Sequence, residues 1–262
     1  MIGQKNNLEK IFNWRMNRST PRFIIITGDK GSGRLTLSKH IAKNINAIPV
    51  IIDDKIDSVR ETIQNAYNVS DTMCYIFRNA DRMSMQAQNA LLKVVEEPPN
   101  NAYFIITLLT PDNTLETIRS RGTLLQIEPY TNEELRNFTT NENMLMYLNT
   151  PGEIKEWKGK DFYGVVDFCN DVVEGLAEVT DGNALKITQR LKFKEEDEGI
   201  DPVLFLRICE RIILETVTGI EKRYQTVELT GLSMNWLSNP SIKKDSIIDI
   251  WLLRVKGVLE NE

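Results

Sequence analysis

A glycine-rich segment near the start of the chain has residue types that could bind a phosphate group. The apolar run FIIIT at 23–27 leads directly into GDKGSGRLT, and a helix-like segment follows. Backbone N–H groups in a loop at the N-terminus of a helix can surround a phosphate. The segment therefore predicts a phosphate-binding turn between a strand and a helix.

Both side chains that perform chemistry in such loops are replaced here. Gly28 and Gly33 match the pattern G-x-x-x-x-G-K-[ST]. Arg34 stands in place of the lysine, and arginine is larger, planar and no simple substitute at a tight site. Leu35 stands in place of the magnesium-binding hydroxyl and cannot ligate a metal. Thr36 does not replace that hydroxyl, because one step along a helix turns a side chain by about 100°. We therefore do not expect this loop to hydrolyse nucleotide.

Two interpretations of the loop remain open. In the simpler one, Gly28, Gly31 and Gly33 only make the tight turn from strand to helix. In the other, the loop with Ser32 and Arg34 keeps weak binding of ATP or ADP, without magnesium-dependent hydrolysis. Neither interpretation requires a cofactor or a metal.

A second apolar run, CYIFRNADRM at 74–83, is expected to lie beside the loop. Active phosphate-loop ATPases end this strand with acidic residues that hold magnesium and orient water. Arg78 and Asn79 occupy those places here, and Asp81 comes two residues later. We interpret Asp81 as a local cap or turn residue. The acidic residues that an ATPase needs at the end of this strand are therefore also missing.

The elements that must position these residues follow an alternating pattern. Short apolar runs alternate with amphipathic segments in the first half of the chain, as in a parallel sheet flanked by helices. The predicted strands are 23–27, 48–52, 74–77, 103–108 and 123–127, and the predicted helices are 8–16, 35–44, 58–67 and 85–95. In the last of these helices we expect the apolar side chains to pack inward and the polar ones, Gln88 among them, to face solvent.

The chain becomes helical after Pro129. Asp201 is a good N-cap and Pro202 suits a first turn, so we predict a helical stretch over 201–224. Further predicted segments are helices at 161–179, 183–193 and 246–259 and a solvated connector at 195–199. The expected parts are an α/β domain at 1–128, a small helical lid at 129–160 and an all-α bundle at 161–262.

Composition excludes several classes of protein. The chain has 262 residues, 41% of them hydrophobic, and a net charge of −5, which gives no electrostatic footprint for independent binding to nucleic acid. No apolar run approaches the ~18 residues of a membrane span, and the first residues lack a signal peptide, so we expect a cytoplasmic protein. Cys74, Cys169 and Cys209 are scattered and are interpreted as buried thiols, and the lone His40 as a surface or packing residue.

The segment NADRMSMQAQNALLKVVEEPPNNAYFIITLLTPDNTLETIRSRG at 79–122 resembles the bacterial clamp-loader delta prime subunit and its relatives, the gamma and tau subunits of DNA polymerase III. Weaker similarity is found in IGQ at 2–4, IDSVRETI at 56–63 and YTNEEL at 130–135. The resemblance covers about 1–135. It implies an AAA+ fold of the phosphate-loop type, with a parallel sheet, a helical lid and a C-terminal bundle that belongs to a collar between subunits.

The resemblance also implies a role for an exposed arginine. The family's S-R-C motif reads Ser120, Arg121, Gly122 here, and its arginine completes the ATP site of a neighbouring subunit. Such an arginine finger typically contributes ~10³ to 10⁵ in rate. The alternative is that Arg121 only makes a surface salt bridge at the end of a helix.

Three departures from the family pattern concern the motif, the zinc module and the nucleotide site. Gly122 replaces the cysteine, which removes packing volume but leaves the charge. The four-cysteine zinc module of many relatives is absent. Glu153 stands where relatives often carry a basic residue, and a carboxylate that faced phosphates would repel them.

Together these residues predict a non-hydrolysing delta prime-like subunit of the sliding-clamp loader. The implied partners are gamma/tau-type and delta-type subunits, with DNA and the sliding clamp inside the complex, and the resemblance implies that the helix at 85–95 lies near a neighbour or the DNA. Two alternatives remain: an ATP-hydrolysing AAA+ motor of the clamp-loader or helicase-loader type, and a stand-alone AAA+ regulator that binds nucleotide or DNA.

Overall fold

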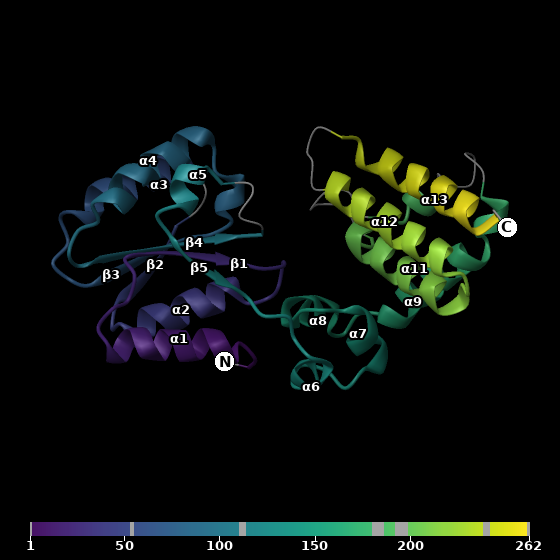
Figure 1. Cartoon of the computed structure of the whole chain (residues 1–262), viewed down its shortest axis with the longest axis horizontal. Coiled ribbons are helices and arrows are strands. Elements are labelled where there is room, and N and C mark those ends of the chain that lie inside the picture. The colour runs from purple at the N-terminus through teal and green to yellow at the C-terminus, as the bar shows by residue number, and fades with distance from the viewer. Residues whose placement is uncertain are drawn as a thin grey trace. The chain divides into compact units, whose positions relative to one another are not determined.

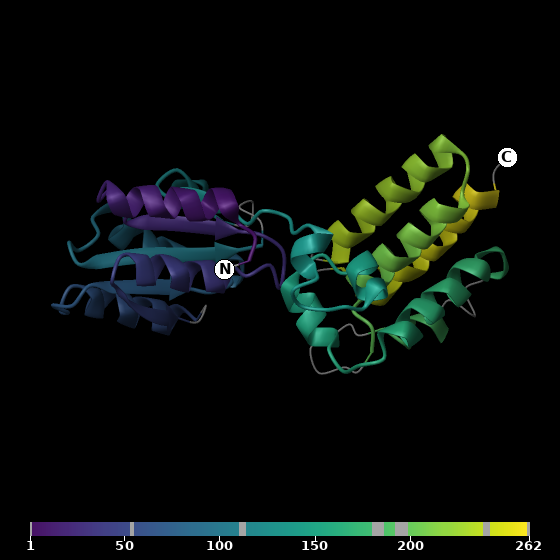
Figure 2. The same ribbon diagram turned by 90° about the horizontal axis from the view of Figure 1, so that it is seen from below.

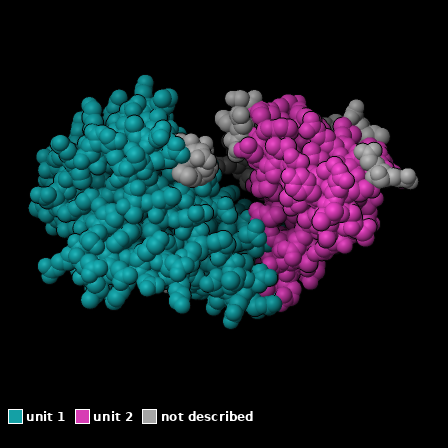
Figure 3. Space-filling model, in the orientation of Figure 1, with its two compact units in different colours: residues 1–140, 148–158 teal, residues 141–147, 159–262 magenta. Residues whose placement is uncertain are grey.

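The computed structural model describes residues 2–52, 55–109, 114–179, 186–191, 199–237 and 242–260. Contacts divide the chain into two compact units (Figure 3). Unit 1 comprises residues 1–140 and 148–158, and unit 2 comprises residues 141–147 and 159–262. No helix in the described ranges is both long and apolar enough to cross a membrane.

Unit 1 contains a five-stranded parallel sheet in the order β2-β3-β4-β1-β5. The strands are β1 (Phe23–Thr27), β2 (Ile48–Ile52), β3 (Met73–Phe77), β4 (Ala102–Leu108) and β5 (Thr123–Gln126). Each predicted strand is confirmed to within one residue at either end. The agreement has a physical cause, because strands covered on both faces are nearly continuous apolar runs, and every residue of β1 is buried.

Helices cover both faces of this sheet (Figure 1). On one face lie α1 (Lys5–Met16) and α2 (Arg34–Asn44), packed through Ile11, Leu37 and Ile41. On the other lie α3 (Ile56–Ala66), α4 (Met85–Glu96) and the short α5 (Glu116–Arg119). The turn η1 (Ala80–Arg82) joins β3 to α4. The predicted α/β fold class is confirmed.

Three short helices follow the sheet: α6 (Asn132–Leu135), α7 (Glu142–Tyr147) and α8 (Pro151–Trp157). Capping boxes begin α6 at Thr131 and α8 at Thr150. The contacts assign α6 and α8 to unit 1 and α7 to unit 2. The three-part division predicted from the sequence is finer than this division into units, and it stays a prediction.

Unit 2 is a helical bundle. Its longer helices are α9 (Phe162–Glu174), α11 (Pro202–Thr216), α12 (Ile220–Leu237) and α13 (Lys244–Glu260), and the short turn η3 (Leu176–Glu178) follows α9. Neighbouring helices pack in the series α9, α11, α12, α13, which Figure 2 shows from a second side. The core includes Phe205 of α11, whose ring meets the ring of Trp251 at 6.1 Å between centroids.

The sequence prediction of the bundle was correct at Asp201 and wrong at residue 217. The Asp201 carboxylate accepts hydrogen bonds from the N–H groups of Val203 and Leu204, as expected of an N-cap. Val217 adopts extended dihedral angles (φ −85°, ψ 129°), so the predicted stretch 201–224 is two helices. The predicted helix at 183–193 and the connector at 195–199 fall partly outside the described residues.

Candidate functional site

The glycine-rich loop makes the turn that its sequence predicts. Gly28, Gly31 and Gly33 all have positive φ, of 154°, 79° and 99°, and Gly33 is the N-cap of α2. A residue with a β-carbon is strained in this region, which explains a glycine directly before the helix. The loop therefore places the N-terminus of α2 at the carboxyl end of β1, where a phosphate could bind.

Arg34 begins α2, directly after this turn. Burial lowers the pKa of Arg34, and the carboxylates of Asp81 and Asp29 act in the opposite direction. Within the described part of the chain, Nη1 of Arg34 and Oδ1 of Asp81 are buried without a hydrogen-bond partner. Two carboxylates thus offset the charge that a bound phosphate would need.

The other residues that the sequence identified lie at the start of α2 and at the end of β3. Leu35 packs against the core on the α1 and α2 face of the sheet, and Thr36 is exposed. At the end of β3, Arg78 is exposed, and Asn79 takes a left-handed conformation with φ 50°. The Asn79 N–H donates to Oγ1 of Thr107 at 3.2 Å. Leu35, Arg78 and Asn79 carry neither a hydroxyl nor a carboxylate, the groups that bind magnesium in phosphate-loop ATPases, and the absence of hydrolysis stays a prediction.

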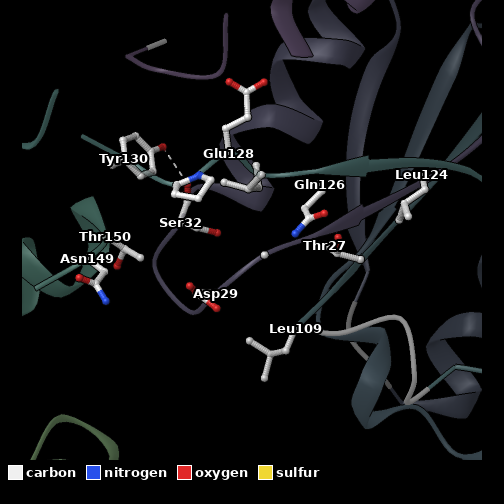
Figure 4. Close-up of a pocket in the computed structure, with 13 residues that line it drawn as sticks. Thr27, Asp29, Ser32, Leu109, Leu124, Gln126, Glu128, Tyr130, Asn149 and Thr150 are labelled. Carbon is white, nitrogen blue, oxygen red and sulfur yellow. Dashed lines mark hydrogen bonds between the residues drawn. The ribbon is translucent and has the colours of Figure 1, made fainter. Parts of the chain in front are cut away.

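Tyr130, which sequence reasoning did not single out, contacts the loop directly. Its hydroxyl donates a hydrogen bond of 2.8 Å to the carbonyl of Ser32 (Figure 4). The Ser32 hydroxyl itself is buried without a partner among the described residues. Burial raises the pKa of Tyr130, so the phenol stays a hydrogen-bond donor at neutral pH.

The beginning of α8 also packs on the loop. The Thr150 hydroxyl donates to the carbonyl of Lys30 at 3.1 Å, and the Gly152 N–H donates to the carbonyl of Gly31 at 3.0 Å. A β-carbon on Gly152 would lie only 2.3 Å from Cα of Gly31. Three consecutive loop carbonyls, counting Ser32, therefore accept hydrogen bonds from the segment that follows the sheet.

Glu153 caps the N-terminus of α8, a role that its position in the family pattern did not suggest. Its carboxylate accepts hydrogen bonds from the backbone N–H groups of Asn149, at 2.9 Å, and Thr150, at 3.1 Å. It therefore closes the capping box of α8. Repulsion between Glu153 and a phosphate stays a prediction, whereas the capping contacts account for a glutamate at this position.

Two cavities of opposite charge flank the loop. A cavity of about 590 Å³ is lined by the loop, by Arg34 and Arg78, and by Lys155 of α8. A cavity of about 550 Å³, which Figure 4 shows, is lined on its polar side by Asp29 and Glu128. Of the two, the first has the charge to receive an anion, and it contains the predicted residues Gly31, Ser32, Gly33 and Arg34, whereas Gly28 lines the second.

Arg121 lies at the end of α5 and lines neither cavity. Its Nη2 is 2.8 Å from Oε1 of Glu96, and its Nη1 donates to the carbonyl of Thr117 at 2.8 Å. The Ser120 hydroxyl donates to the same carbonyl at 3.2 Å. The salt bridge of the second interpretation is therefore present, and 39% of the Arg121 side chain remains exposed.

The space beside Gly122 is filled from the sheet. A β-carbon on Gly122 would lie 2.5 Å from Cδ1 and Cγ1 of Ile25 and 3.1 Å from a ring carbon of Phe23. The volume that a cysteine would occupy in the S-R-C motif is thus taken by Ile25.

One residue of α4 departs from the sequence prediction. Gln88 does not face solvent: it is buried, its Nε2 donates to the carbonyl of Met83 at 3.3 Å, and its Oε1 accepts from the N–H of Leu115 at 2.9 Å. Gln88 therefore ties α4 to the N-cap of α5, which carries the arginine motif.

The remaining candidate groups show no chemistry of their own. Cys74, Cys169 and Cys209 are buried free thiols as predicted, and burial raises the pKa of Cys74 to about 12. Burial lowers the pKa of His40, which is partly exposed on α2. No cluster of side chains suited to hold a metal ion occurs in the part of the chain that the structure describes.

Comparison with known proteins finds similarity to subunits of DNA polymerase III. Residues 16–131 match the family model described as DNA polymerase III, delta subunit. The delta' subunit of DNA polymerase III from Buchnera aphidicola subsp. Baizongia pistaciae is 26% identical over 190 residues, which are 69% of this chain and 53% of that protein. The gamma subunit from Buchnera aphidicola subsp. Schizaphis graminum is 26% identical over 169 residues, 53% of this chain and 47% of that protein. The chain thus spans about half the length of these curated relatives.

A solved structure supports the fold. A RuvB variant from Thermotoga maritima superposes with a TM-score of 0.50 at 16% identity, and covers 97% of this chain and 88% of that one. The family-model match at 16–131 lies on the α/β part that carries the loop and the arginine motif. Through that part, the chain is similar to the clamp-loader subunits of DNA polymerase III.

Proposed function

We propose that this protein is a delta prime-like subunit of a sliding-clamp loader and does not hydrolyse ATP itself. In this proposal Arg121, preceded by Ser120, is an arginine finger for ATP held by a neighbouring gamma/tau-type subunit. A delta-type subunit, the sliding clamp and DNA are the other partners within the complex. DNA replication in bacteria places such a complex in the cytoplasm.

The observation that carries the proposal is the position of Arg121 relative to the chain's own loop. Arg121 is exposed at the end of α5 and lines neither cavity beside that loop. Its guanidinium is available to a ligand from outside the chain, and a guanidinium placed against a γ-phosphate stabilises the charge of the transition state. The motif is therefore useful to a neighbour even when the chain's own loop is inactive.

The loop supports the second half of the proposal. Arg34 replaces the lysine, the partly buried Leu35 packs against the core, and the charge of Arg34 is offset by Asp81 and Asp29. The proposal requires no nucleotide in this loop. Residual ATP or ADP binding in the cavity of about 590 Å³ is compatible with it, without magnesium-dependent hydrolysis.

ATP turnover of a reconstituted complex tests the proposal. The complex contains this chain, the gamma- and delta-type subunits of the same organism, the sliding clamp and primed DNA. Arg121→Ala is expected to lower turnover at the finger-dependent site by on the order of 10³-fold, and Arg121→Lys should not restore it, because lysine lacks the planar fork. Arg15→Ala is the matched control, since Arg15 is an exposed arginine on α1, which covers the other face of the sheet.

Each contrary outcome points to one of the alternatives. Turnover by the isolated chain that is lost in Arg34→Ala would identify an ATP-hydrolysing motor. Failure to assemble with either subunit, measured by size-exclusion chromatography, would favour a stand-alone AAA+ regulator. Turnover of an assembled complex that is indifferent to Arg121→Ala would refute the finger.

A further inference from the structure

Glu96 is the acidic partner of Arg121. It is the last residue of α4, and its Oε1 lies 2.8 Å from Nη2 of Arg121. The side chains of Glu96 and Arg121 are 48% and 39% exposed. An ion pair as open to water as this contributes little to folding stability, so a purely structural purpose explains it poorly.

The second contact of Arg121 restrains the same guanidinium from another direction. Nη1 donates to the carbonyl of Thr117, one turn earlier, at 2.8 Å. A guanidinium has five N–H donors in a rigid plane, so these two contacts leave three for a further acceptor. The side chain is thus held in one orientation while most of its donors stay available.

The element that carries Glu96 is itself firmly placed. Leu91, Val94 and Val95 of α4 are buried in the core on the face of the sheet that α4 covers. The side-chain oxygen of Gln88 in α4 also accepts a hydrogen bond from the N–H of Leu115, directly before α5. One helix therefore contacts the arginine segment at its beginning, through Gln88, and at its end, through Glu96.

We infer that Glu96 is a positioning residue that holds the Arg121 guanidinium ready for the γ-phosphate of a neighbouring subunit, an inference that rests on the function proposed above. A long arginine side chain without this contact samples many rotamers, and a finger must be oriented before it can stabilise a transition state. Glu96 itself does not contact the nucleotide. It acts through Arg121.

The test measures kcat and KM for ATP in the reconstituted complex for Glu96→Gln. The expected result is a fall in kcat of about 10- to 100-fold, the effect of a misplaced catalytic group, with KM unchanged because the neighbour's loop binds the nucleotide. Glu96→Asp, which keeps the charge, should recover part of the loss. In an Arg121→Ala background, Glu96→Gln should cause no further loss. Glu97→Gln is the matched control, because Glu97 is the adjacent exposed acid.

Other outcomes overturn the inference and separate it from the proposed function. A normal kcat in Glu96→Gln, with a low kcat in Arg121→Ala, would reduce the pair to a surface contact and leave the finger standing. A higher kcat in Glu96→Gln would mean that the pair masks the finger. If Arg121→Ala itself has no effect, the proposed function fails, and the role of Glu96 fails with it.

Discussion

Replacing Gly152 by alanine tests whether α8 rests directly on the phosphate loop. The new β-carbon would lie 2.3 Å from Cα and 2.8 Å from the carbonyl oxygen of Gly31. Both are backbone atoms, so no side-chain rotation relieves the overlap. Because carbon atoms pack at about 3.5 Å or more, α8 must move away from the loop by roughly 1 Å.

This displacement sets the size of the effect. It breaks the hydrogen bond from Gly152 to Gly31 and weakens the one from Thr150 to Lys30, which are now 3.0 and 3.1 Å long. Two hydrogen bonds at about 0.5 to 1.5 kcal/mol each amount to about 1 to 3 kcal/mol. A gain of about 0.5 to 1 kcal/mol from replacing glycine offsets part of this loss. The expected net loss of stability is roughly 1 kcal/mol, within a range of about 0 to 2.5 kcal/mol.

Urea unfolding and hydrogen exchange together measure this outcome. The urea midpoint of unit 1 should fall, and the Gly152 amide should exchange faster. Gly231→Ala is the matched control, because a β-carbon on Gly231 of α12 meets nothing within 4 Å, and it should leave stability unchanged or raise it. Wild-type stability in Gly152→Ala, with continued protection of that amide, would refute the described packing of α8 on the loop.

Two further predictions concern other positions. Gly122→Ala should lower the free energy of unfolding by about 1 to 3 kcal/mol, because its β-carbon overlaps Ile25. In a double-mutant cycle measured by urea unfolding, Ile25→Ala should reduce that loss. Additive effects of the two substitutions would contradict the overlap. Burial raises the pKa of Glu210 in α11, so its contribution to stability is complete below the unfolded-state pKa and is lost as pH rises through the folded-state pKa. Glu210→Gln should therefore flatten the decline in stability above the ordinary glutamate pKa and raise the melting temperature at neutral pH. Parallel curves of melting temperature against pH for wild type and variant would contradict this.

The sequence predicted the sheet well because its signal is local. The run Ile24–Ile26 is apolar at each position, as a strand buried on both faces requires, and flanking glycines mark its end. The turn at Gly33 was readable for the same reason. Both follow from residues that are adjacent in the chain.

Features that depend on partners distant in sequence were not predictable in this way. A glycine at 152 signals a close approach but does not identify Gly31 as the partner. A glutamine on an amphipathic helix has the same pattern whether it is solvated or, like Gln88, buried between two backbone groups. In contrast, the T-x-x-E pattern at Thr150 and Glu153 was a readable capping signal that the family comparison obscured.

The assignment of α7 to the bundle has a consequence for how the chain can be cut. The polypeptide passes between the two units after residues 140, 147 and 158. Within unit 2, Arg207 and Arg211 of α11 donate to the carbonyls of Tyr147 and Met146. A single cut after residue 158 leaves α7 on the fragment 1–158, so that only noncovalent contacts such as these hydrogen bonds can hold α7 to α11. No single cut therefore divides the chain into two fragments that correspond to the two units, although each unit has its own core.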